Sequence, residues 1–140
     1  MISRRPFIGL WKAPAILLAM MLLGGWWHGG VGGSATIVPK TANFNIASAA
    51  SGTIYTNEGA SAQITGTIQS NTAGLDYGFV VQNSNGIVIQ LPAGATAWIG
   101  STSTSVGGTL TSTTVTGQIE ILAINSTTWT AISTGTWVAQ

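Results

Sequence analysis

Beyond a Gly-rich stretch in its first third, the chain shows hydrophobic residues at the two-residue period of β-strands. In residues 62–69, Ile64 and Ile68 fall on one face while threonines and glutamines fall on the other, which predicts a half-buried strand. Residues 77–82 are apolar on both faces and indicate a central strand. Residues 87–91 alternate again, so they predict a third strand.

Turn residues separate these strands about every ten residues, a spacing that is typical of small all-β domains. Asn85 and Gly86 both tolerate positive φ, which favours the tight turn of a β-hairpin. The sequence therefore predicts a hairpin between residues 77–82 and residues 87–91.

The strand pattern continues to the C-terminus. Residues 117–124 and 127–133 are runs of β-branched and aromatic residues that predict a second hairpin, and residues 135–138 predict the last strand. Residues 101–116 are rich in Thr and Ser, and because threonine is favoured in strands they predict edge strands and loops. For residues 53–140 we expect an all-β fold, a small antiparallel sandwich, barrel or prism of about seven to nine short strands.

Residues 36–52 differ from this domain in composition and hydrophobic pattern. They are mostly Gly, Ala, Ser and Asn with scattered apolar residues and no sustained period. Such a composition indicates an extended linker before the β domain.

Residues 1–35 have the order of a bacterial export signal: a basic start, an apolar run over residues 13–27 and a Gly-rich tail. The small residues at the end of the tail would suit a signal peptidase, which predicts cleavage before Thr36. Residues 3–8 also resemble the twin-arginine export motif, which would imply export of an already folded chain.

Two other roles for residues 1–35 are open. As a helix the apolar run would be about 22 Å long, which is short for a hydrocarbon core of about 30 Å. If the segment is retained, residues 7–27 would anchor the chain in a membrane, with Trp26 and Trp27 at the interface. Otherwise the segment is an apolar assembly arm that docks on neighbouring subunits.

Charge is scarce along the whole chain, since only 5% of residues are charged while 45% are hydrophobic. After residue 35 one lysine stands against three carboxylates, which leaves a net charge of −2 and argues against binding to nucleic acid. So little charge also provides little repulsion between copies, and we expect a homo-oligomer or a part of a larger assembly.

The residues needed for catalysis are missing from the predicted β domain. It has no cysteine and no histidine, so it offers no thiolate and no imidazole to activate a serine. Its glycines do not form a phosphate-binding loop, and its carboxylates are Glu58, Asp76 and Glu120, too few to expect a metal site. We therefore expect no enzyme activity, no cofactor and no bound metal.

Aromatic side chains are the remaining candidates for a binding role. A sugar ring can stack on indole or phenol rings, so a glycan-binding platform is one interpretation. The other is that these residues fill the core or a subunit interface. The candidates are Trp98, Trp129, Trp137, Tyr55 and Tyr77.

The C-terminal residues 117–137 carry a further signal. Residues 117–122 form a Gly-initiated strand, residues 125–133 follow the pattern N-x-T-x-W-x-A-I-S, and residues 135–137 read G-T-W. Together with the paired strands upstream, this pattern resembles surface β modules of tailed-phage virions over residues 53–138. The resemblance implies a trimeric or otherwise repeated module of a tail fibre, tail tip or capsid surface, which decorates or cements the particle or binds host glycans.

The expected function is therefore that of a non-enzymatic virion structural or surface protein, of decoration or fibre type. Its partners would be copies of itself, in a trimer or another homo-oligomer, and other structural subunits, with glycan as a further ligand. The alternative is a secreted or membrane-anchored bacterial surface protein that forms filaments or binds glycans. Its location would be the virion surface or the extracellular space, or a membrane if residues 7–27 are retained.

Overall fold

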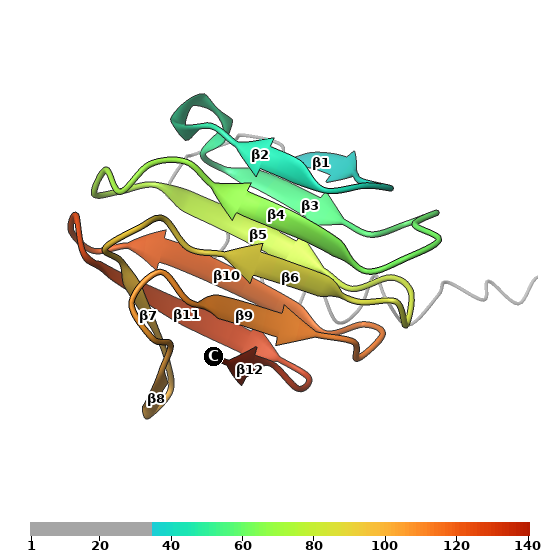
Figure 1. The fold of residues 1–140 in the computed structure, drawn as a ribbon. Helices are drawn as coiled ribbons and strands as arrows, with labels where there is room; N and C mark the ends of the chain where they lie inside the picture. The colour runs from blue at the N-terminus through green and yellow to red at the C-terminus, as the bar shows by residue number, and fades with distance from the viewer. Residues whose placement is uncertain (1–34) are drawn as a thin grey trace, which may run out of the picture. The chain divides into compact units, whose positions relative to one another are not determined.

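The computed structural model describes residues 35–140, in which twelve strands form two sheets (Figure 1). In order across the sheet, sheet A contains β1 (Thr36–Pro39), β3 (Thr53–Thr56), β5 (Asp76–Val80), β10 (Gln118–Ala123), β11 (Thr128–Thr134), β7 (Thr96–Ile99) and β8 (Thr102–Ser103). Sheet B contains β12 (Val138–Ala139), β9 (Thr109–Ser112), β6 (Ile87–Gln90), β4 (Ile64–Ile68) and β2 (Phe44–Ile46). A short 3-10 helix, η1 (Ser48–Ala50), follows β2.

The all-β class predicted from the sequence is confirmed, but the strand pairing is mixed. In sheet A the strands β1, β3 and β5 are parallel neighbours, and in sheet B the same holds for β2, β4 and β6. Up to β7 successive strands alternate between the sheets, so each of β3 to β6 pairs with the strand two positions earlier in the chain. The expected antiparallel pairing and the expected number of about seven to nine strands are corrected, since several neighbours are parallel and the described residues form twelve strands.

The hairpin predicted at Asn85 and Gly86 is wrong. β5 lies in sheet A, whereas β6 lies in sheet B and is parallel to β4. The turn between them carries the chain from one sheet to the other, with the N–H of Gly86 donating to the Asn83 carbonyl at 3.2 Å. Glycine is required here because φ is 87° and a Cβ atom would lie 2.6 Å from the Ser112 carbonyl oxygen.

The second predicted hairpin is confirmed. β10 and β11 pair antiparallel with Ile121 opposite Ala131, and the hairpin inserts between β5 and β7 in sheet A. β11 is parallel to β7 on its other side, and β10 is antiparallel to β5. The C-terminal half of the chain therefore adds antiparallel strands to a framework that its N-terminal half builds in parallel.

Residues 36–52 are not a linker in the structure. They form β1, β2 and η1, and both strands pair in the sheets, β1 with β3 and β2 with β4. Ile46 is fully buried, and Phe44 packs at the edge of the core. Two apolar side chains are enough to anchor a segment of small residues at the edge of a sheet. The composition of the segment therefore did not indicate its strands.

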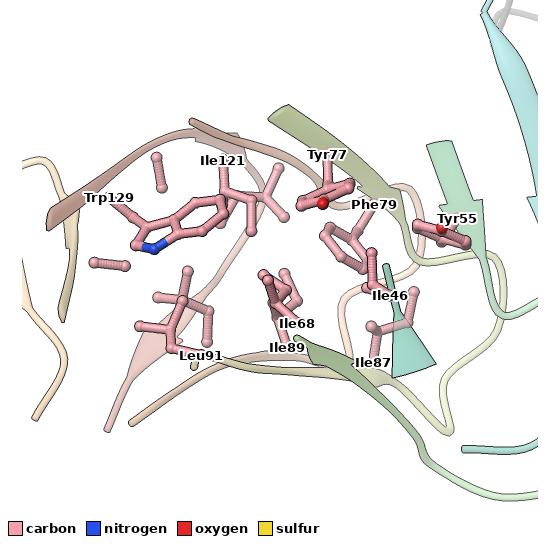
Figure 2. Close-up of a cluster of buried hydrophobic side chains, with 14 of the residues drawn as sticks. Ile46, Tyr55, Ile68, Tyr77, Phe79, Ile87, Ile89, Leu91, Ile121 and Trp129 are labelled. Atoms are coloured by element: carbon pink, nitrogen blue, oxygen red, sulfur yellow. The ribbon is translucent and has the colours of Figure 1, made fainter. Parts of the chain in front are cut away.

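The core lies between the two sheets and is lined by aromatic and aliphatic side chains from both (Figure 2). Tyr55 contacts Phe79 with ring centroids 5.7 Å apart, and Tyr77 stacks on Trp129 at 6.2 Å. Isoleucines of sheet B, among them Ile87 in Figure 2, pack against this aromatic row. Residues 34–140 form one compact unit that includes the whole of this core, as expected of a domain that folds by itself.

The predictions for residues 1–35 fall outside the described part of the chain, apart from Ala35. These include the export signal, the membrane anchor with Trp26 and Trp27, and the assembly arm. Over residues 35–140, no helix is long and apolar enough to cross a membrane.

Candidate functional site

The outer face of sheet A exposes large apolar side chains on three adjacent strands. On β11, Trp129 and Ala131 point into the core, so strand alternation directs Thr130 and Ile132 outward. The same alternation directs Leu122 of β10 and Trp98 of β7 outward. We call the following four residues the sheet A patch: Trp98, Leu122, Ile124 and Ile132, which are 47%, 38%, 52% and 59% exposed.

The strand register brings these side chains together. Thr130 lies opposite Trp98 on one side and opposite Leu122 on the other, so the three form one row across β7, β11 and β10. Ile132 is the next outward residue along β11, and Ile124 lies directly after the end of β10, two residues beyond Leu122. Neighbouring rows of a sheet lie about 7 Å apart, so the patch is continuous.

Two carboxylates border the patch on one side only. Glu120 lies opposite Ile132 in the β10–β11 ladder, and Asp76 lies opposite Leu122 in the β10–β5 ladder. Asp76 accepts a 2.6 Å hydrogen bond from the Ser51 hydroxyl. On the other side of β11, the outward positions of β7 and β8 are Thr96, Trp98 and Ser103, and none of them is acidic.

Lys40 is the cationic residue of the described domain, and it is distant in sequence from the patch residues. Lys40, directly after β1, places its Nζ 5.1 Å from the centre of the Phe44 ring and 5.9 Å from that of Tyr55. Such cation–π contacts hold the ammonium over aromatic faces. Lys40 thus covers the aromatic end of the core, as lysine stems do elsewhere over apolar surface.

The acidic residues do not converge into a metal site within residues 35–140, where no group of three or more His, Cys, Asp or Glu side chains could hold an ion. Glu58 lies in the exposed turn after β3. Asp76 and Glu120 occupy diagonal positions of adjacent strands, which are typically about 7–8 Å apart. Both stand on the outer face of sheet A, and residues 35–140 contain no histidine.

Of the five aromatic candidates, Trp98 alone is exposed. The other four are buried and belong to the core cluster: Trp129, Trp137, Tyr55 and Tyr77. They occupy the interior and are not at the surface where a sugar could stack on them. A glycan-stacking role is left to Trp98, which Thr130 and Ser103 flank in its row.

Burial also affects the two core tyrosines. The pKa of Tyr55 is raised above its ordinary value, mainly because burial disfavours the phenolate. The pKa of Tyr77 is raised for the same reason, with smaller contributions from Tyr55 and from the negative charge of Asp76. The Tyr77 hydroxyl donates to the Ala47 carbonyl at 3.2 Å, which ties β5 to the segment after β2.

Sequence reasoning missed three of the four patch residues. Leu122, Ile124 and Ile132 lie in predicted strands, but at positions where an alternating strand would carry polar residues. The inward positions are those of Ile119 and Ile121 in the first strand and of Trp129 and Ala131 in the second. Apolar residues at outward parity are the signal that would have found them. It was hidden because these strands are rich in isoleucine on both faces.

No known protein-family model matches this chain, and no curated protein matches it. The fold and the site define a two-sheet β domain with mixed pairing and one apolar outer face.

Proposed function

We propose that this protein is a non-enzymatic structural component of a virion surface, of decoration or fibre type, that assembles as a homo-oligomer. The sheet A patch carries the proposal. Four large apolar side chains on one face are costly to leave in water, and contiguous patches of this kind mark protein interaction sites. Because the domain has so few charges, little repulsion opposes contact between copies.

The virion assignment rests on the resemblance of residues 117–137 to phage surface modules. The residues of that pattern serve the fold: Trp129 and Trp137 are buried in the core, and Gly135 adopts a positive φ of 73°. They position β10 and β11, the two strands that present most of the patch. The resemblance and the patch thus concern the same part of the molecule.

Sedimentation velocity on residues 34–140 and on the full chain tests the assembly. We expect a discrete oligomer at micromolar concentration that Ile132→Asp dissociates, because the substitution places a charge in the patch. Val138→Asp is the matched control, since Val138 is 49% exposed on sheet B. A wild-type domain that stays monomeric would refute the assembly claim.

The location is tested separately by mass spectrometry of gradient-purified particles. Detection of the chain in particles with Met1 or its directly following residues present supports the virion assignment. Recovery of the chain only in membranes or culture medium, processed near Thr36, would contradict it.

A second candidate is a secreted or membrane-anchored bacterial surface protein that forms filaments or binds glycans. The observation that favours it is Trp98, an exposed indole flanked in its row by the hydroxyl-bearing residues Thr130 and Ser103. Binding to a neutral glycan array that is lost in Trp98→Ala, while sedimentation is unchanged, would support this candidate over the first.

A further inference from the structure

We propose that the partner of the sheet A patch is a second copy of this chain, and that the two copies pack sheet A against sheet A about a two-fold axis that runs along β11. This inference rests on the proposed homo-oligomer and adds the pairing of its residues. It assigns Trp98 of each copy to a contact with Leu122 of the other.

The position of β11 in the patch suggests this axis. β11 lies between β7 and β10, and Thr130 lies between Trp98 and Leu122 in one row. Each neighbouring strand is about 4.8 Å away. Rotation by 180° about β11 exchanges the two sides, so the large indole of one copy meets the smaller Leu122 of the other, and the reverse contact follows by symmetry.

The carboxylates distinguish this axis from a two-fold axis that runs across the strands. Glu120 and Asp76 both lie on the β10 and β5 side of β11. Rotation about β11 places them opposite β7 and β8 of the partner copy, where Gly100 and Ser103 leave room and supply a hydroxyl. Rotation about an axis across the strands, along the row of Leu122 and Thr130, would set each residue of that row against its own copy. Asp76 would then face Asp76, and like charges facing each other oppose association.

The geometry also agrees with how sheets pack. Two twisted sheets stacked face to face keep their strands within about 30° of each other and lie about 10 Å apart. An axis along β11 brings β11 of one copy over β11 of the other in this aligned class. Thr130 then lies at the axis, where its small side chain allows the larger neighbours to interdigitate.

Chemical crosslinking tests the pairing, and the absence of native cysteine makes it clean. A short bismaleimide reagent should crosslink Thr130→Cys to itself, since both copies of that residue lie at the axis. It should crosslink a mixture of Trp98→Cys and Leu122→Cys at least about fivefold more than either variant alone, because identical residues lie two strands apart. Thr67→Cys on the outer face of sheet B is the matched control and should stay uncrosslinked.

Each outcome of this experiment decides something, provided that every variant retains the wild-type circular dichroism spectrum. An oligomer in which Thr130→Cys does not crosslink, or in which Leu122→Cys crosslinks best to itself, overturns this pairing and leaves the proposed function standing. A monomer by sedimentation overturns both. Crosslinking at Thr67→Cys would assign the contact to sheet B and overturn the inference.

Discussion

Thr116 is a β-branched residue with a positive φ, a backbone conformation that such residues rarely adopt. The N–H of Gly117 donates to the Thr114 carbonyl at 2.8 Å, which closes a turn whose third residue, Thr116, has a φ of 71°. Two turns closed in the same way have glycine at this place, Gly74 with a φ of 86° and Gly94 with a φ of 83°. A β-branched residue in this region is strained, so Thr116 destabilises the turn that leads into β10.

Replacing Thr116 with glycine should therefore stabilise the domain, by about 1 kcal/mol, because the relief of the left-handed conformation exceeds the entropy cost of glycine. Urea unfolding followed by tryptophan fluorescence measures the change. Val115→Gly, at the preceding position of the same turn, should instead lower stability because its φ is not positive. Equal effects of the two substitutions would refute the strain argument.

The core tyrosines make stability depend on alkaline pH. In the unfolded chain both phenols ionise near the ordinary pKa of 10.0, whereas burial raises the pKa of Tyr55 and Tyr77 in the folded domain. Because the folded-state pKa values are the higher ones, their contribution is fully present below about pH 10 and is lost as the pH rises further. The melting temperature should fall as the pH rises above about 10, and the double variant Tyr55→Phe, Tyr77→Phe should show a shallower fall. An unchanged slope in that variant would place the alkaline loss elsewhere.

At the scale of elements, a pair of asparagines joins two of the turns that carry the chain from sheet A to sheet B. Asn57, after β3, is fully buried, and its Oδ1 accepts the N–H groups of Gln82 and Asn83 at 2.6 and 3.1 Å. Its Nδ2 donates to the Asn83 carbonyl at 3.0 Å, and Asn83 returns a hydrogen bond to the Asn57 carbonyl. The turn after β3 and the turn after β5 are thereby held as one unit.

Asn57→Ala should cost about 2 kcal/mol or more, because it leaves two part-buried N–H groups without their acceptor. The free energy of unfolding in urea measures this loss. Asn45→Ala is the control: Asn45 is exposed and accepts one long hydrogen bond of 3.4 Å from Gln69, so its loss should cost less than about 0.5 kcal/mol. A similar loss of unfolding free energy in both variants would show that the asparagine pair does not hold the two turns together.

The elements also show which parts of the fold the sequence could predict. The β10–β11 hairpin was predicted because its partners are adjacent in the chain and the turn residues between them act locally. The turn at Asn85 and Gly86 has the same local chemistry but crosses between sheets, since β6 pairs with β4 across more than twenty residues of chain. Local turn signals do not specify which sheet the next strand joins.

At the scale of the whole molecule, the two sheets present different outer faces. Sheet A exposes the patch, whereas the outward positions of β4 and β9 in sheet B are threonines. Composition predicted self-association, because it reports how little charge and how much apolar surface exist. It could not predict which face would carry the association that we propose, because that depends on which side of its strand a residue such as Ile132 faces.

The face that carries the proposed association also determines how the assembly would respond to salt. An interface made by the patch buries apolar side chains and keeps Glu120 and Asp76 apart from their counterparts, so Coulomb terms contribute little to it. The association constant should therefore change by less than about threefold between 0.1 M and 1 M sodium chloride, although the screening length falls from about 10 Å to about 3 Å. It should rise in sodium sulfate, which strengthens apolar burial. Sedimentation equilibrium at several salt concentrations measures this. If instead Lys40 of one copy pairs with a carboxylate of the next, high salt weakens association tenfold or more and the Lys40→Met variant loses that dependence, a result that would move the interface from the patch to the β1 edge.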